Sequence, residues 1–257
     1  MFAVKLIVTD LDNTLLSSSK TISSYSTDVL NRCKKENIRI AFATARPERA
    51  VCRFITAIDP HYIISNNGAT VTRGSTVLYN KKISPEISTD LLENFRDAEA
   101  ITLISVEVGH CLYTNYKGPP WEDGWNPVYH DFSALIKDDV VKVSTECANI
   151  KIVQDIIAKY PELHLYANSG ESWQQIMHRD ATKLNAIKFI ADDLKIDLTD
   201  VAAFGDDYND IEMLSHCGIG IAVENAIPEA QKAANFTCGS NEADGIAHWL
   251  EANILRH

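Results

Sequence analysis

The stretch VKLIVTDLDNTLL, residues 4–16, indicates the fold because it ends a buried strand in two acidic residues. Residues 4–8 are almost continuously apolar and mostly β-branched or aliphatic, which is typical of a parallel strand covered on both faces. Asp10 and Asp12 follow directly. If the chain stays extended there, both carboxylates enter one small volume and repel each other, so something must compensate that repulsion.

Length and charge limit the class of protein. The chain has 257 residues, 46% of them hydrophobic, and a formal net charge of −11. This size allows one large domain or two ordinary ones with a substantial core. The 24 lysines and arginines are thinly spread, which argues against nucleic acid and against an anionic membrane surface as partners. An anionic small substrate would need a metal ion or nearby basic residues to offset the negative charge of the protein at the binding site.

Targeting and cysteine patterns favour the cytoplasm. The first residues have neither a cationic start nor a small-residue cleavage site, and no apolar run approaches the ~20 residues that span a bilayer. The cysteines are scattered without a C-x-x-C pair. We therefore expect reduced thiols, mostly in the core and not in a metal site, at Cys33, Cys52, Cys111, Cys147, Cys217 and Cys238.

Strand and helix patterns alternate at both ends of the chain. The first part predicts a βαβαβ unit with a parallel sheet and right-handed crossovers, followed by a β-hairpin around Arg73 and Gly74. The last part resumes the same alternation after Arg179. The expected strands are 4–9, 38–43, 62–65, 201–204 and 220–223. The expected helices are 24–36, 47–58, 183–194, 209–217, 228–234 and 243–254.

The middle of the chain follows another pattern. It predicts helices at 85–96 and 148–160 and strands at 140–144, 163–167 and 172–178, with shorter alternating strands before them. We therefore predict an α/β fold, with a doubly wound parallel-sheet core of residues 1–82 and 179–257 and an inserted α+β domain of residues 83–178.

One turn-rich segment of the insertion is rich in aromatic residues. It reads GPPWEDGWNPVYHDF, residues 118–132, and contains Trp121, Trp125, Tyr129 and Phe132. These side chains either pack inside the inserted domain or bind a sugar ring through their aromatic faces.

A second acidic group resembles the first. VAAFGDDYNDIEML, residues 201–214, is another apolar strand that ends in acidic residues. Ligands of open α/β sheets bind at the carboxyl ends of strands, so Asp10, Asp12 and Asp206 should meet in one crevice. Such an all-oxygen site suits Mg²⁺, whose charge would offset the repulsion. The alternative is that Asp12 begins an Asx turn and Asp210 caps a helix.

The segments FATARPER and ATKLNAI, residues 42–49 and 181–187, add a hydroxyl and an amine. Thr44 ends the second strand and Lys183 begins a helix that returns to the sheet, so both should face the same crevice. A hydroxyl, an ammonium and helix N-terminal amides suit the oxygens of a phosphoryl group. Taken singly, Thr44 could cap a helix and Lys183 could be a solvated lysine.

In this order, the motifs resemble those of haloacid dehalogenase superfamily phosphatases of the Cof type, which have a large inserted cap. The family's D-x-D-x-T, threonine, lysine and acidic motifs match residues 10–14, 43–46, 183 and 205–210, and its asparagine–glycine segment matches SNNGA, residues 65–69. The sequence departs from the family at Asn13, Ala45 and Leu184, where relatives often have glycine. These departures affect substrate fit more than chemistry.

The resemblance implies an Mg²⁺-dependent phosphatase for a small phosphorylated metabolite such as a sugar phosphate. Asp10 would form an aspartyl-phosphate, and Asp12 would protonate the leaving group and then activate water. Mg²⁺ would be held by Asp10, the backbone carbonyl of Asp12 and Asp206, with Asp210 behind them. The substrate would be bound by Thr44, Ala45, Arg46, Asn66, Asn67, Gly68, Lys183 and Asn209.

Two other functions remain open from the sequence. A phosphomutase of the same superfamily would return the phosphoryl group to a sugar and not to water. A phosphorylation switch would also gather carboxylates, a threonine and a lysine around Mg²⁺ at strand ends. Asp12 disfavours the switch, because a carboxylate two residues after the nucleophile hastens hydrolysis of the phosphoryl group.

Overall fold

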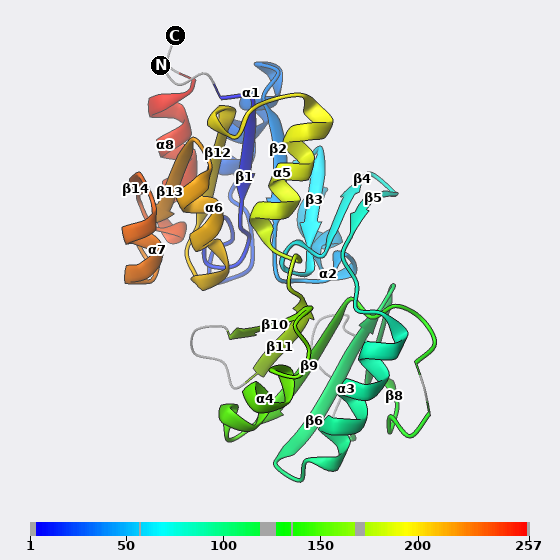
Figure 1. Ribbon diagram of the computed structural model, residues 1–257. Helices are drawn as coiled ribbons and strands as arrows, with labels where there is room; N and C mark the ends of the chain where they lie inside the picture. Colours follow the sequence, from blue (N-terminus) through cyan, green and yellow to red (C-terminus); the bar gives the residue numbers. More distant parts are fainter. Residues whose placement is uncertain (1–3, 57, 119–126, 135, 168–172, 256–257) are drawn as a thin grey trace. The chain divides into compact units, whose positions relative to one another are not determined.

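The computed structural model describes residues 4–56, 58–118, 127–134, 136–167 and 173–255. The chain forms two compact units. The first comprises Met1–Tyr79 and Thr182–His257, and the second comprises Asn80–Ala181. Each unit has its own sheet and its own hydrophobic core (Figure 1), which is the usual property of a domain.

The first unit is built on an eight-stranded sheet with the order β14-β13-β12-β1-β2-β3-β4-β5. From β14 to β3 all neighbours run parallel, and β4 runs antiparallel to β3. The predicted hairpin therefore extends the same sheet at its edge. The strands are β1 (Leu6–Thr9), β2 (Arg39–Ala43), β3 (Tyr62–Ser65), β4 (Thr70–Arg73), β5 (Thr76–Asn80), β12 (Val201–Gly205), β13 (Ile219–Val223) and β14 (Phe236–Cys238).

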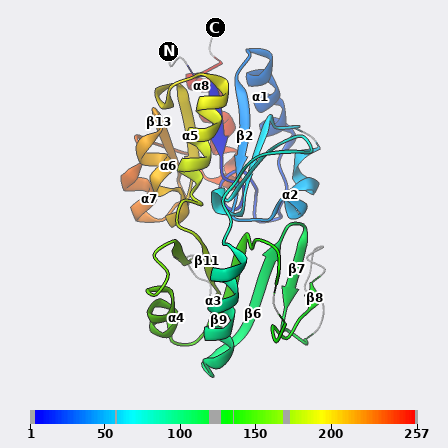
Figure 2. The same cartoon turned by 45° about the vertical axis from the view of Figure 1, so that its right-hand side comes forward.

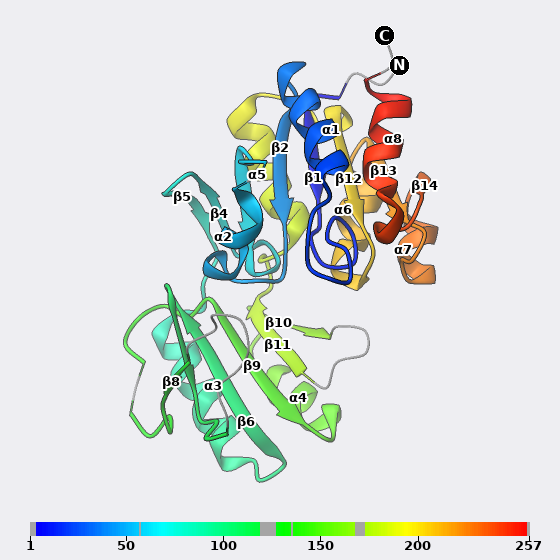
Figure 3. The ribbon, with the colours of Figure 1, turned by 180° about the vertical axis from the view of Figure 1, so that it is seen from behind.

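Helices cover both faces of this sheet. They are α1 (Ser24–Lys35), α2 (Glu48–Ile55), α5 (Lys183–Leu194), α6 (Ile211–His216), α7 (Pro228–Ala233) and α8 (Gly245–Asn253). Ile7 of β1 packs in one core with α1 and α8 (Figure 3), whereas Leu6 and Val8 pack in the other core with α5 and α6 (Figure 1). Successive residues of a strand point to opposite faces, and Leu6, Ile7 and Val8 are therefore all apolar. The predicted doubly wound α/β class is confirmed.

Local chemistry explains where the elements of the first unit begin. The hydroxyl of Ser23 accepts a hydrogen bond from the backbone of Ser26 at the start of α1, and Thr182 does the same for Asn185 at the start of α5. The predicted helix 209–217 instead begins with a 3₁₀ turn, Tyr208–Asp210, because Asp207 and Asp210 close a reciprocal capping box. The short strand β14 was not predicted, since two of its three residues are exposed.

The second unit contains a six-stranded sheet with the order β10-β11-β9-β6-β7-β8. Its strands are β6 (Ile101–Val108), β7 (Cys111–Thr114), β8 (Val128–Tyr129), β9 (Lys142–Cys147), β10 (Leu163–Ala167) and β11 (Trp173–His178). The helices α3 (Pro85–Asp97) and α4 (Ile150–Ile157) pack on it through one shared core (Figure 2). The strand predicted at 140–144 begins at Lys142 in the structure. Val140 instead forms an isolated bridge with Ile83, which lies near the start of the second unit.

The aromatic segment of this unit is partly described. Phe132 is buried in the core with α3 and α4, whereas Tyr129 is exposed and has the Lys117 ammonium over its ring. Trp121 and Trp125 lie outside the described residues. Packing therefore accounts for Phe132. In the parts of the chain that the structure describes, no helix has the length and apolar character needed to cross a membrane.

Candidate active site

The candidate site of the first unit lies at the carboxyl ends of β1, β2, β3 and β12. Asp10 follows β1, and its backbone N–H donates to the carbonyl of Phe204 in β12 at 2.9 Å. Asp206 follows β12 directly. Because neighbouring parallel strands end at the same edge, two distant stretches of sequence deliver their acidic residues to one place.

Lys183 joins two of these acidic residues. Its Nζ atom lies 2.6 Å from Oδ1 of Asp10 and 2.6 Å from Oδ1 of Asp210. Lys183 is only 1% exposed. It is therefore not the solvated lysine that the sequence left open, but a buried cation shared between two carboxylates.

In the acidic segment after β12, one side chain binds the backbone of the residues just before it. Oδ2 of Asp210 accepts hydrogen bonds from the backbone N–H groups of Asp206 and Asp207, at 2.9 and 3.2 Å. A Cβ atom on Gly205 would lie 2.5 Å from Cβ of Asp210, so glycine is required for this close approach. Asp210 thus completes the turn before α6 and also faces Lys183. It occupies the N-cap position of α6, but its side chain makes no capping hydrogen bond to that helix, so the capping alternative does not explain the residue.

Three buried carboxylates meet at this point with one lysine between them. Asp10, Asp206 and Asp210 each offer an oxygen, and these oxygens lie within 4.8 Å of one another. Burial, together with the charges of Asp210 and Asp206, raises the pKa of Asp10 despite the opposing effect of Lys183. Burial and Asp210 likewise raise the pKa of Asp206, to about 7, although the Thr14 hydroxyl donates to it. Negative charge in the cluster is incompletely compensated.

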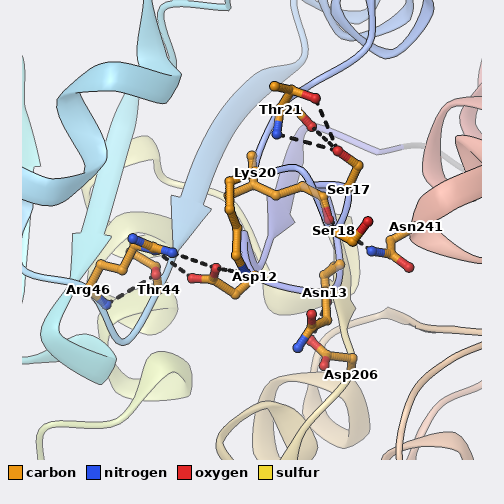
Figure 4. A network of polar contacts seen from close by, with 12 residues as sticks. Asp12, Asn13, Ser17, Ser18, Lys20, Thr21, Thr44, Arg46, Asp206 and Asn241 are labelled. Atoms are coloured by element: carbon orange, nitrogen blue, oxygen red, sulfur yellow. Dashed lines mark hydrogen bonds and ion pairs between the residues drawn. The ribbon is translucent and has the colours of Figure 1, made fainter. Parts of the chain in front are cut away.

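Asp12 has other partners. Arg46 donates from Nε to Oδ2 at 2.6 Å and from Nη2 to Oδ1 at 2.7 Å, while Nζ of Lys20 lies 2.8 Å from Oδ1 (Figure 4). Burial raises the pKa of Asp12, but the hydrogen bonds from Arg46 and Lys20 outweigh it and lower the pKa below its usual value.

The chain does not stay extended after β1, so the condition under which the two carboxylates of the first motif would enter one volume is not met. The strand ends at Thr9 and the chain turns at Leu11, so Asp10 and Asp12 do not alternate as in an extended strand. The negative charges of Asp206 and Asp210 act on Asp10, whereas Asp12 accepts hydrogen bonds from the cations Arg46 and Lys20. The carboxylate of Asp12 is not a member of the three-carboxylate cluster.

Thr44 lies in the turn after β2 and is 1% exposed. Its Oγ1 atom accepts from the backbone N–H of Arg46 at 3.1 Å, and Pro47 occupies the N-cap position of α2. Thr44 therefore shapes the turn and does not cap the helix. Ala45, between Thr44 and Arg46, is half-buried.

The segment after β3 closes against this turn. The backbone N–H groups of Asn66 and Asn67 donate to the carbonyls of Arg46 and Thr44, both at 2.9 Å. Asn67 also accepts from Nδ2 of Asn209 at 2.8 Å, which links the ends of β3 and β12. The structure thus brings the predicted asparagines together.

Gly68 fixes this segment against the start of α5. Its φ is +100°, and a Cβ atom there would lie 2.1 Å from the carbonyl oxygen of Thr182. Glycine is required on both grounds. Lys183 follows Thr182 directly, so Gly68 lies beside the helix end that carries the buried lysine.

Several residues near the site were not singled out from the sequence. Lys20 belongs to no motif, and it contacts Asp12 because the loop after β1 folds back toward that residue. Asn225 donates from Nδ2 to the carbonyl of Asn13 at 2.7 Å, and Asn241 donates to the carbonyl of Leu16 at 2.9 Å. Asn225 lies in the segment AVENA, residues 222–226, which comes after the acidic motif at the end of the next strand, whereas no local sequence pattern identifies Lys20 or Asn241.

Comparison with known proteins gives one family for nearly the whole chain. The family described as haloacid dehalogenase-like hydrolase matches residues 7–250. A sequence relative from Bacillus subtilis strain 168 is named 5-amino-6-(5-phospho-D-ribitylamino)uracil phosphatase YitU. It is 26% identical over 261 residues, which cover 96% of each chain.

Solved structures share the fold. The structure of the subclass IIB sugar phosphatase BT4131 has a TM-score of 0.84 at 21% identity and covers 97% of this chain and 98% of its own. The phosphatase BT1666 from Bacteroides thetaiotaomicron has a TM-score of 0.86 at 22% identity, with 97% and 94% covered. At such identities the similarity concerns the fold alone.

Proposed function

The chain belongs to the family of haloacid dehalogenase-like hydrolases, and on that premise we propose that it is a phosphatase that hydrolyses a small phosphorylated metabolite through an intermediate on Asp10. The arrangement of Asp10, Lys183 and Asp210 carries this proposal. A buried carboxylate beside a buried ammonium combines a nucleophile with a charge that attracts phosphoryl oxygens.

In the first step an oxygen of Asp10 attacks phosphorus, and the bond from phosphorus to the leaving oxygen breaks. Asp12 enters this step with the proton that the second step of each turnover returns to it, and gives that proton to the leaving oxygen, which departs as an alcohol. Lys183, Thr44 and Asn209 stabilise the charge that develops on the other phosphoryl oxygens. The product of this step is an aspartyl-phosphate on Asp10.

In the second step a water molecule attacks the phosphorus of the aspartyl-phosphate. Asp12 takes a proton from the water, the bond between phosphorus and Asp10 breaks, and inorganic phosphate leaves. The contacts of Asp12 with Arg46 and Lys20 favour its ionised form, which is the form that accepts this proton. Arg46, Ala45, Asn66, Asn67 and Gly68 line the approach to these groups on the substrate side.

The acidic cluster fits Mg²⁺ as a cofactor. Its oxygens lie close together and are all hard carboxylate donors, while one lysine leaves part of their charge uncompensated. Asp10, Asp206, Asp210 and the backbone carbonyl of Asp12 are the groups that would hold the ion. When bound, Mg²⁺ would disperse the negative charge of the carboxylates and of the phosphoryl group.

We further propose a sugar phosphate as the substrate class and the second unit as the part that selects it. The sugar phosphatase BT4131, which shares the fold over nearly the whole chain, supports this choice. The uracil-derivative phosphatase YitU shows that a sequence relative acts on another phosphorylated metabolite.

A substrate panel tests the proposal. Purified protein with Mg²⁺ is incubated with hexose phosphates, pentose phosphates, nucleotides and flavin-precursor phosphates, and both free phosphate and isomerised sugar are measured. We expect free phosphate from a sugar phosphate, and loss of activity in Asp10→Asn. Isomerisation without free phosphate would identify a phosphomutase, and activity in Asp10→Asn would contradict the assigned nucleophile.

A further inference from the structure

Lys20 contacts the proposed general acid Asp12 from another loop than Arg46 does, and both cations donate to Oδ1 of Asp12 (Figure 4). Its Nζ atom lies 2.8 Å from Oδ1 of Asp12. We propose that Lys20 is a positioning residue, which holds the Asp12 carboxylate in the orientation that proton transfer requires. The proposal rests on the proposed function, in which Asp12 exchanges that proton.

The loop that carries Lys20 is closed by its own hydrogen bonds. The backbone N–H of Lys20 donates to the carbonyl of Ser17 at 2.9 Å, and that of Ser17 donates to the carbonyl of Thr21 at 3.1 Å. The hydroxyls of Ser17, Ser19 and Thr21 lie within 3.0 Å of one another. Lys20 itself has φ +57°, a backbone conformation that lysine rarely adopts. The turn therefore sets the direction in which the Lys20 side chain leaves the backbone.

Residues from the far end of the sequence fix this loop in place. Oε1 of Glu242 accepts from the backbone N–H of Ser18 at 2.6 Å, and Asn241 holds the carbonyl of Leu16. Asn225 holds the carbonyl of Asn13, next to Asp12. A surface lysine normally samples many rotamers, but this one starts from a backbone that is held on several sides.

Stability does not explain the contact. The side chains of Lys20 and Asp12 are 41% and 32% exposed, and a pair with that exposure contributes little to folding. Both oxygens of Asp12 already accept from Arg46. Lys20 instead adds a second direction of attachment. If Arg46 left Asp12 for an anionic substrate, the contact of Lys20 with Asp12 would remain.

Two artificial substrates separate this role from others. Phenyl phosphate has a poor leaving group that needs a proton, whereas p-nitrophenyl phosphate has a good one that needs little. The variants are Lys20→Met and Lys20→Arg. Lys5→Met is the control, because Nζ of Lys5 also lies 2.8 Å from a carboxylate, that of Asp200, at the opposite end of β1.

We expect Lys20→Met to lower kcat/KM for phenyl phosphate about tenfold or more, a part of the roughly 10²–10⁴-fold effect of general acid catalysis. The value for p-nitrophenyl phosphate should change far less, and phosphoenzyme should accumulate because the second step also needs Asp12. Lys20→Arg should restore most of the activity, and Lys5→Met should match the wild type.

Other outcomes would overturn the proposal. A raised KM with unchanged kcat would mean that Lys20 binds substrate, and an equal loss on both substrates with a lower melting temperature would mean a structural role. A crystal structure of Lys20→Met gives a readout that needs no turnover, since an unchanged Asp12 carboxylate would also refute positioning. Failure of the proposed function itself would show separately, as a wild type that hydrolyses neither substrate.

Discussion

The ammonium of Lys183 lies 2.6 Å from Oδ1 of Asp10, and both side chains are buried in the first unit. The same ammonium contacts Asp210, so one cation serves two carboxylates. Burial alone would lower the pKa of Lys183, but Asp10 and Asp210 raise it above its usual value, which keeps the lysine charged. The site therefore depends on this lysine before any substrate binds.

Replacing Lys183 should harm both folding and activity. Lys183→Met leaves two buried carboxylates without their partner, which costs about 3–5 kcal/mol at neutral pH. We expect the free energy of unfolding, measured with urea in EDTA, to fall by that amount and phosphatase activity to disappear. Lys188→Met, on an exposed position of the same helix, is the control. Equal stability of the two variants would contradict the assigned role.

Divalent metal should stabilise the protein through the acidic cluster. A ligand that binds only the folded state adds RT ln(1 + [L]/Kd) to its stability, so the melting temperature should rise with Mg²⁺ concentration and fall back in EDTA. Asp206→Asn should reduce this rise. Asp207→Asn is the matched control, because Asp207 is adjacent in sequence but outside the three-carboxylate cluster. A rise of equal size in both variants would place the metal elsewhere.

The fold could be predicted because its signals are local. The strand at β3 and the helix at α5 have the predicted bounds, since a short apolar run or a capped amphipathic segment is complete in itself. The helix predicted from residue 209 shows the limit. The Asp210 side chain accepts hydrogen bonds from a backbone N–H group of its own segment and from Lys183. The helix α6 therefore begins only at Ile211.

The candidate site could be predicted in its members but not in its pairings. Sequence motifs named Asp10, Asp12 and Lys183, yet their spacing could not show that Asp12 turns away from the acidic cluster. That depends on a turn at Leu11 and on Arg46 from another loop. Lys20 was missed for the same reason, because a contact across a loop has no periodicity in the sequence.

His61 should contribute a loss of stability to the first unit at mildly acidic pH. Burial, with Arg39 and Lys34 nearby, lowers its pKa below the unfolded value of about 6.5. As pH falls below 6.5 the unfolded state binds the proton first, so stability is lost until pH passes the folded pKa. His61→Gln should reduce that loss in urea titrations between pH 8 and pH 5.5. Parallel losses in both proteins would exclude His61 as the cause.

Thiol reactivity should distinguish Cys111 from the buried cysteines. Cys111 is exposed, whereas burial raises the pKa of Cys33 to about 11 and those of Cys217 and Cys238 to about 12. Because the thiolate is the reactive form, N-ethylmaleimide at pH 7.5 should modify Cys111 first in the native protein. Peptide mass mapping over time tests this order, and Cys111→Ser should remove the fast site. Early modification of Cys217 would mean that the C-terminal end of α6, which Cys217 follows, opens readily.

The last prediction separates Asp10 from Asp12. Asp10→Asn removes the proposed nucleophile, so no phosphoenzyme should form and turnover should fall to background. Asp12→Asn keeps the nucleophile and the three-carboxylate cluster, and removes proton transfer, which contributes roughly 10²–10⁴-fold. With p-nitrophenyl phosphate the first step needs little protonation, whereas the attack of water still needs a base. Phosphate should therefore accumulate on Asp10 in Asp12→Asn alone.

Intact-mass measurement after rapid acid quench tests this difference directly. Asp12→Asn should gain the mass of one phosphoryl group within a single turnover, and peptide mapping should place it on Asp10. The wild type should show little of it, because its second step is fast. Asp207→Asn controls for the loss of a neighbouring carboxylate that is not a member of the three-carboxylate cluster. Two results would contradict the assigned roles. One is that neither Asp10→Asn nor Asp12→Asn carries the phosphoryl adduct. The other is that both variants retain equal turnover, because a nucleophile and a proton-transfer group should not be lost with the same effect.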